Sequence, residues 1–85
     1  MKLSVEMSLY PLKDEYIPVI KHFIDRVNTH ADLKVITNTM STQIFGDYDR
    51  VMDVIRDEMR YSFEQFGRAV FVCKFIDSDL SPHEQ

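Results

Sequence analysis

The stretch NTMSTQIFGD, residues 38–47, decides the fold because it combines a turn, a strand and the entry to a helix. Its first three residues suit a tight connection from a preceding strand at 33–37, since Asn tolerates turn conformations. Residues 41–45 are predicted to form a strand that ends at Gly46. Asp47 is expected to cap the following helix, where negative charge is favourable. The stretch therefore predicts a hairpin whose second strand leads directly into a helix.

The chain before this stretch predicts one strand and one helix. Residues 2–10 alternate between apolar and polar side chains, which indicates a half-buried strand, and Pro11 ends it because proline lacks the N–H donor. A helix follows, with Asp14 or Glu15 near its N-terminus and an exit loop at residues 28–32. Its apolar stripe is predicted to comprise Ile17, Ile20, Ile24 and Val27, with Phe23 adjacent.

The chain after this stretch predicts a second helix and a last strand. The apolar stripe of the helix is predicted to comprise Val51, Met52, Ile55 and Met59. Phe63 and Phe66 should extend the apolar side into a loop that precedes Gly67. Residues 68–76 form the last strand, and because this strand is apolar on nearly both faces it should be central or covered.

The predicted order β-α-β-β-α-β belongs to the α+β class. Two helices on one face of a four-stranded antiparallel sheet make a ferredoxin-like sandwich. The usual strand order of that fold puts the first and third strands in the centre, here residues 2–10 and 41–45. We expect one domain over residues 1–77 and a polar, flexible tail over residues 78–85.

Composition narrows the classes of function. The 85 residues suffice for one small core with little margin, so association with other copies would be a natural supplement. A net charge of −4 disfavours binding to nucleic acid, which uses basic patches.

The single cysteine, Cys73, permits no intramolecular disulfide and suits a reducing compartment. With no signal peptide and no apolar run of spanning length, we expect a cytoplasmic protein with no membrane contact.

One face of the sheet is expected to remain without helices. The side chains of the last strand that would then face water are either Val70, Val72 and Ile76 or Phe71, Cys73 and Phe75. Because an exposed apolar patch of this kind marks an interface, the sequence predicts a homo-oligomer, dimer or tetramer, assembled through the sheet.

Polar side chains that could carry chemistry are scattered. His22, His30 and His83 share no helical face at metal-ligand spacing, so no metal site and no cofactor are expected. The acids after residue 47 suit a solvated helix face. Hydroxyls at Ser8 and elsewhere have no histidine placed to activate them, so they suit either outward polar positions or hydrogen bonds to a ligand.

Two segments resemble the thiamine-binding, YkoF-like family of small proteins. VEMSLYPL, residues 5–12, is similar to the family's first-strand pattern, and TMSTQIFGD, residues 39–47, is similar to its third-strand signature, a Met-Gly-Thr-like step before a Gly-Asp helix entry. The resemblance covers roughly residues 2–77. It implies a ferredoxin-like fold, association through sheets, and binding of thiamine or its hydroxymethylpyrimidine moiety without catalysis. Ser41 departs from the pattern, because the family has glycine there.

The ligand site is expected where these two strands lie side by side. Residues that match the family's polar signature are Tyr10, Met40, Ser41 and Thr42. The predicted polar groups of the pocket are Ser8, Tyr10, Asn38, Ser41 and Thr42, with Met40 as an apolar wall. Glu6 or Asp47 could stabilise the positive charge of the thiazolium, and an aromatic side chain such as Tyr10 could stack on it.

Two other functions compete with ligand binding. The domain could be an oligomeric regulatory or interaction module with no retained ligand, which a pocket filled by Phe45, Tyr48 or Phe66 would favour. It could also be a small enzyme of the dimeric ferredoxin-like barrel type, which needs a histidine or carboxylate within reach of the substrate. Only His22 and Glu6 are eligible for that role, so we expect no enzyme.

Overall fold

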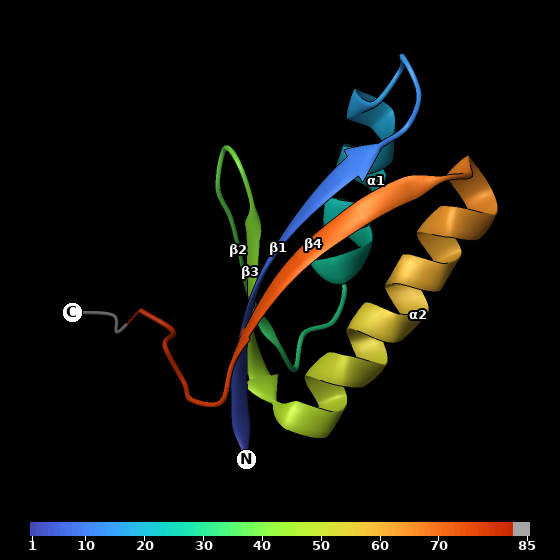
Figure 1. Ribbon diagram of the computed structural model, residues 1–85. Helices are drawn as coiled ribbons and strands as arrows, with labels where there is room; N and C mark the ends of the chain where they lie inside the picture. Colours follow the sequence, from blue (N-terminus) through green and yellow to red (C-terminus); the bar gives the residue numbers. More distant parts are fainter. Residues whose placement is uncertain (83–85) are drawn as a thin grey trace.

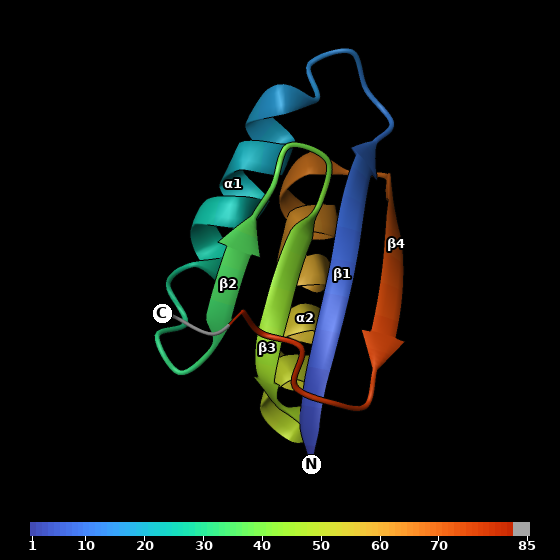
Figure 2. The same ribbon diagram turned by 90° about the vertical axis from the view of Figure 1, so that its left-hand side faces the viewer.

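The computed structural model describes residues 1–82 and contains six elements in the predicted order. They are β1 (Lys2–Pro11), α1 (Ile17–Val27), β2 (Lys34–Thr37), β3 (Thr42–Asp47), α2 (Tyr48–Phe66) and β4 (Ala69–Ile76). The strands form one antiparallel sheet in the order β2-β3-β1-β4, and both helices cover the same face (Figures 1 and 2). The ferredoxin-like sandwich is confirmed, as is the central position of β1 and β3.

The core lies between the helices and the two central strands. Alternate residues of β1 face the helices, because successive side chains of a strand point to opposite faces. Ile44 of β3, which pairs with Val5, has no exposed surface. The buried cluster comprises Leu3, Val5, Met7, Phe23, Val27, Leu33, Ile44, Val51, Val54 and Ile55.

The buried stripe of α1 differs from the predicted one. The helix buries Val19, Phe23 and Val27, whereas Ile17 is 64% exposed in the first turn. Apolar residues occupy two neighbouring rows of this helix, both with a spacing of three or four. Periodicity alone could not decide between the rows, since the choice depends on how the helix lies on the sheet. Ile20 and Ile24 are half-buried at its flank.

The second helix begins after Asp47, as predicted, but it is longer than predicted and lacks a side-chain bond at its N-cap. Phe63 and Phe66 belong to α2, which ends at Gly67 with a φ of 86°, a value that favours glycine. Asp47 makes no side-chain capping bond, which corrects the predicted cap, because its carboxylate pairs with Lys2 Nζ at 2.9 Å. Gly46 lies within β3, where a Cβ would come within 2.6 Å of a Leu33 side-chain carbon.

The strand β4 lies at the edge of the sheet, so the prediction of a central or covered strand was wrong. Its Val70, Val72 and Ile76 share the open face of the sheet and are 45–51% exposed. A strand with apolar side chains on an exposed face has the same apolar pattern as a buried strand, so the pattern of this strand alone could not distinguish the two.

Residues 77–82, which we call the strap, leave the end of β4 and cross the open face of the sheet (Figure 2). Ser4 Oγ donates to the Ser78 carbonyl at 2.6 Å and accepts the Leu80 N–H at 2.9 Å. The flexibility expected for residues 78–85 stays a prediction. His83 and the two residues after it lie outside the described part of the chain.

Candidate functional site

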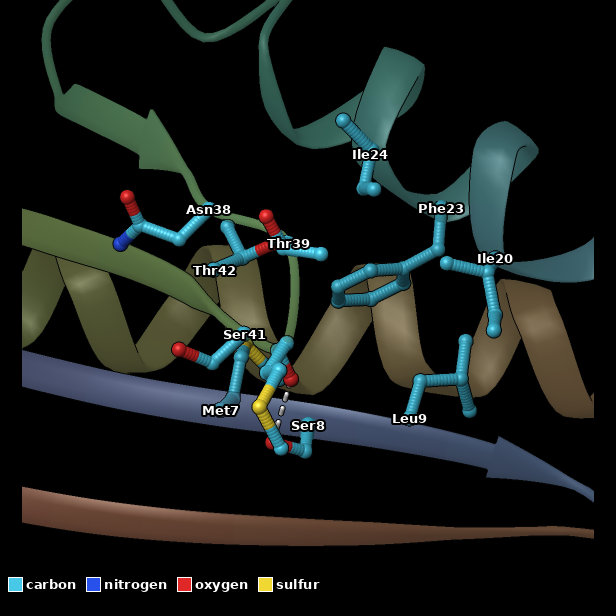
Figure 3. Close-up of a pocket in the computed structure, with 11 residues that line it drawn as sticks. Met7, Ser8, Leu9, Ile20, Phe23, Ile24, Asn38, Thr39, Ser41 and Thr42 are labelled. Atoms are coloured by element: carbon cyan, nitrogen blue, oxygen red, sulfur yellow. Dashed lines mark hydrogen bonds between the residues drawn. The ribbon is translucent and has the colours of Figure 1, made fainter.

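A gap opens between the two central strands at the end of β1. Pairing of β1 with β3 ends at Met7 and Thr42, whereas pairing with β4 continues to Pro11. Within the described chain, residues 8–11 therefore have a strand neighbour on one side only. The loop 38–41 and one flank of α1 face this edge and enclose a cleft of about 80 Å³ (Figure 3).

The cleft has one polar side and one apolar side. The polar side is formed by Ser8, Asn38, Thr39, Ser41 and Thr42. The apolar side is formed by Met7, Leu9, Ile20, Phe23 and Ile24. In Figure 3 the Phe23 ring points from α1 toward the loop that carries Ser41. A flat ring with polar edges would find an aromatic wall and several hydrogen-bonding groups in this arrangement.

Hydrogen bonds hold the loop 38–41 over the gap. The Asn38 N–H donates to the Ser41 carbonyl at 2.8 Å, which closes the turn. Ser8 Oγ donates to the Met40 carbonyl at 3.2 Å and so connects β1 to the loop (Figure 3). Ser41 Oγ donates to a Glu6 carboxylate oxygen at 3.2 Å. The hydroxyls therefore position the loop as well as lining the cleft.

The structure brings five of the six predicted ligand-binding residues to this cleft, namely Ser8, Asn38, Met40, Ser41 and Thr42. Met40 stands at the mouth and is 86% exposed, while Thr42 is buried. Tyr10 does not line the cleft. It pairs with Val70 of β4 on the open face and is 56% exposed.

The two expected charge partners lie in different places. Glu6 projects from the open face, one residue from Met7, and reaches the cleft through its bond with Ser41. Its carboxylate also lies 3.5 Å from Lys74 Nζ. Asp47 lies at the far end of β3, where the hydrogen bond from the Lys2 ammonium lowers the pKa of its carboxyl. Glu6 is therefore the acid beside the cleft.

Sequence reasoning missed the wall contributed by α1. Phe23, Ile20 and Ile24 were assigned to the core stripe, and they do lie on the inner side of the helix. Their position over the gap follows from where β3 stops pairing with β1, which no local pattern reveals. The sequence did contain one usable signal. Ile20 and Ile24 form an apolar row beside the row of Val19, Phe23 and Val27, and since one helix cannot bury both rows equally, one row was available to line a cleft.

Of the two groups eligible for catalysis, His22 lies away from the cleft, whereas Glu6 lies beside it. The His22 ring stacks on Tyr61 at 5.5 Å and contacts Phe66, between the two helices, whereas Glu6 lies on the opposite face of the sheet. The buried Glu58 accepts hydrogen bonds from Arg26 at 2.9 Å and His30 at 3.0 Å, which joins the helices. None of these helix groups lines the cleft.

Other site types receive no support from residues 1–82. This part of the chain contains no group of three or more His, Cys, Asp or Glu side chains that could hold a metal ion. It also contains no helix long and apolar enough to cross a membrane. Burial raises the pKa of the Cys73 thiol, which keeps it protonated and poorly nucleophilic.

The fold and the cleft define a small ferredoxin-like domain with a candidate ligand site at the gap in its sheet. The model of the YkoF-related family matches residues 2–76, and the chain belongs to this family. No curated protein matches the chain.

Solved structures share the fold. Protein SP2199 of Streptococcus pneumoniae has a TM-score of 0.85 at 18% identity, with 94% of this chain and 90% of that chain covered. Hypothetical protein MJ1052 of Methanocaldococcus jannascii has a TM-score of 0.78 at 25% identity, with 95% and 84% covered. TM0486 of Thermotoga maritima, described as a candidate thiamine biosynthesis or salvage protein, has a TM-score of 0.80 at 19% identity, with 95% and 85% covered.

Proposed function

We propose that this protein binds thiamine or its hydroxymethylpyrimidine precursor, without catalysing a reaction, in the cleft between β1 and β3. The observation that carries the proposal is the free edge of β1 at residues 8–11, which lies beside hydroxyl groups and opposite an aromatic wall. Membership of the YkoF-related family supports it, as does the description of the similar Thermotoga protein in terms of thiamine.

The chemistry of an aminopyrimidine suits this cleft. The ring presents nitrogen acceptors and an amino donor, and the edge of a strand offers backbone N–H and C=O groups in alternation. The hydroxyls of Ser8, Ser41 and Thr42 and the Asn38 amide can satisfy the remaining groups. The ring then lies against Phe23, and the cationic thiazolium lies toward Glu6, where opposite charge stabilises it.

The size of the cleft adds a requirement. Its volume of about 80 Å³ is well below the roughly 300 Å³ at which small-molecule sites begin. The loop 38–41 therefore has to move outward when the ligand enters, which breaks the hydrogen bond from Ser8 to Met40 and the one from Ser41 to Glu6. Because Met40 is at the mouth, its flexible side chain can then cover the bound ring.

The same proposal includes assembly and location. The apolar side chains Val70 and Val72 on the open face support a dimer or tetramer formed through the sheet. We infer a cytoplasmic protein that uses neither nucleic acid nor a membrane as its partner. An interaction module without a ligand is the weaker alternative, since none of Phe45, Tyr48 and Phe66 fills the cleft.

Isothermal titration calorimetry tests the ligand. Wild-type protein should give heat with thiamine or hydroxymethylpyrimidine at millimolar ligand. Thr42→Val, which keeps the shape of a buried side chain and removes its hydroxyl, should weaken binding about tenfold, the equivalent of one lost hydrogen bond. Thr29→Val, on an exposed loop, is the matched control. Absence of heat with both ligands rejects the proposal, and equal affinity of Thr42→Val and wild type rejects this cleft as the site.

A further inference from the structure

The strap covers one half of the open sheet face. It starts at the end of β4 and crosses β1 toward β2, where Lys34 Nζ donates to the Pro82 carbonyl at 2.9 Å (Figure 2). Ser4 is only 4% exposed and Phe45 only 7%, although both side chains project from the face without helices. On the uncovered half of the same face, Val72 is 51% exposed.

The strap is exposed along most of its length. Its bonds to the sheet include the two to the Ser4 hydroxyl and the one from Lys34. Leu80 is still 55% exposed, and a hollow of about 330 Å³ remains between Leu80, Phe45 and Ile76. A segment with little buried apolar surface opens at low cost in free energy. The strap can therefore leave the sheet while the domain stays folded.

The covered half decides whether the face is large enough for an interface. The four strands have 10, 4, 6 and 8 residues, and with a rise of about 3.3 Å per residue and a spacing of about 4.8 Å they present a flat face of about 440 Å². Half of that area, about 220 Å², is far below the roughly 500 Å² per partner that a specific interface needs, whereas the whole face approaches it. Two packed sheets also lie only about 10 Å apart, with their side chains interdigitated, so no backbone layer fits between them.

We propose that the strap competes with a second copy of this chain for the open face of the sheet. The inference rests on the assembly through the sheet that is part of the proposed function. Glu6 and Lys74 lie side by side on this face, so the face carries one negative and one positive charge. A second copy of the chain is the fitting occupant because its identical face can place a lysine against Glu6 and a glutamate against Lys74. When the strap is closed, the face is too small to pair; when it is released, the whole face is available.

The competition should change the apparent dissociation constant of the dimer by a measurable factor. If the strap is closed nine times in ten, each copy loses a factor of about ten in effective affinity. Both copies have to release their straps, so the apparent dissociation constant of the dimer rises about a hundredfold.

Sedimentation equilibrium on full-length variants tests the proposal. Ser4→Ala removes the hydroxyl that holds two strap bonds, and Leu80→Asp places a charge over the apolar hollow. Each should lower the dimer Kd at least tenfold. Leu12→Asp, at an exposed leucine off the sheet, makes the same chemical change and should leave the Kd unaltered. A chain that ends at Ile76 should show the full hundredfold effect, and if it does not fold the two full-length variants decide alone.

The outcomes separate this inference from the function on which it rests. Variants that dimerise with the wild-type Kd, or more weakly, overturn the competition and leave assembly through the sheet intact. Monomers in every sample up to millimolar concentration overturn both the competition and the assembly. Ligand binding is decided separately, by calorimetry on the same samples.

Discussion

The two halves of β1 differ in what surrounds them. Residues 2–7 pair with β3 on one side, and residues 4–7 also pair with β4 on the other side. In this half Leu3 and Val5 are at most 3% exposed. Residues 8–11 pair with β4 alone, and Tyr10 is 56% exposed. One continuous strand therefore stabilises the fold with its first half and leaves backbone groups available in its second. Since such groups need a partner, the difference explains why the candidate ligand site lies where it does.

The largest expected effect concerns the doubly paired half. Ile44→Ala removes a side chain with no exposed surface beside Val5, and it should lower the free energy of unfolding by about 3–4 kcal/mol. Leu9→Ala, at a half-buried site in the singly paired half, should cost about 1–1.5 kcal/mol because the space is already partly open to water. Urea unfolding measures both, and equal losses would contradict the comparison.

A smaller effect is expected for the backbone of β1 itself. Amide hydrogen exchange should be about thirtyfold faster for the cleft-facing amides of residues 8–10 than for residues 3–7, which corresponds to about 2 kcal/mol of local opening. Added ligand should slow exchange in the faster group, and the amides of β4 that pair with β1 serve as an internal control. Uniform protection along β1 would show that the gap is closed in solution.

The smallest expected effect is the pH dependence of the ion pair between Lys2, at the start of β1, and Asp47. Lys2 lowers the pKa of the Asp47 carboxyl below its ordinary value of 3.8, so the folded state binds this proton less readily than the unfolded state. The pair therefore stabilises the fold above that value and ceases to do so as the pH falls below it. Asp47→Asn should lower the urea midpoint slightly at pH 6 and leave it unchanged near pH 2. Asp14→Asn, at an exposed loop acid, is the control, and a pH-independent difference for Asp47→Asn would contradict the assignment.

The fold could be predicted where the evidence was local. Alternation in β1 identified Leu3, Val5 and Met7 as the buried face, because a strand repeats every two residues. The buried row of α1 could not be chosen in the same way, since Val19 and Ile20 begin rows of equal periodicity. The edge position of β4 follows from the strand order expected for the fold, although the apolar pattern of the strand by itself indicated a central or covered one.

The candidate site shows the same division. Asn38, Ser41 and Thr42 were grouped in advance because they are neighbours in the chain, and Ser8 because β1 and β3 were expected to be adjacent. Phe23 was missed as a wall of the cleft because its role depends on where a helix crosses a gap. Tyr10 shares the open face with Ser8 because the side chains of a strand alternate, but it lies two residues farther along β1 and does not line the cleft.

The sequence by itself determined the order of elements, the central strands and the residues that meet at the turn before β3. These follow from periodicity and from short-range turn chemistry, which act within a few residues. Only the tertiary structure decided that β3 stops pairing at Met7, that α1 closes the resulting gap, and that the strap lies on the open face. Those features depend on contacts between residues distant in the chain, such as Ser4 and Ser78, for which no local pattern exists.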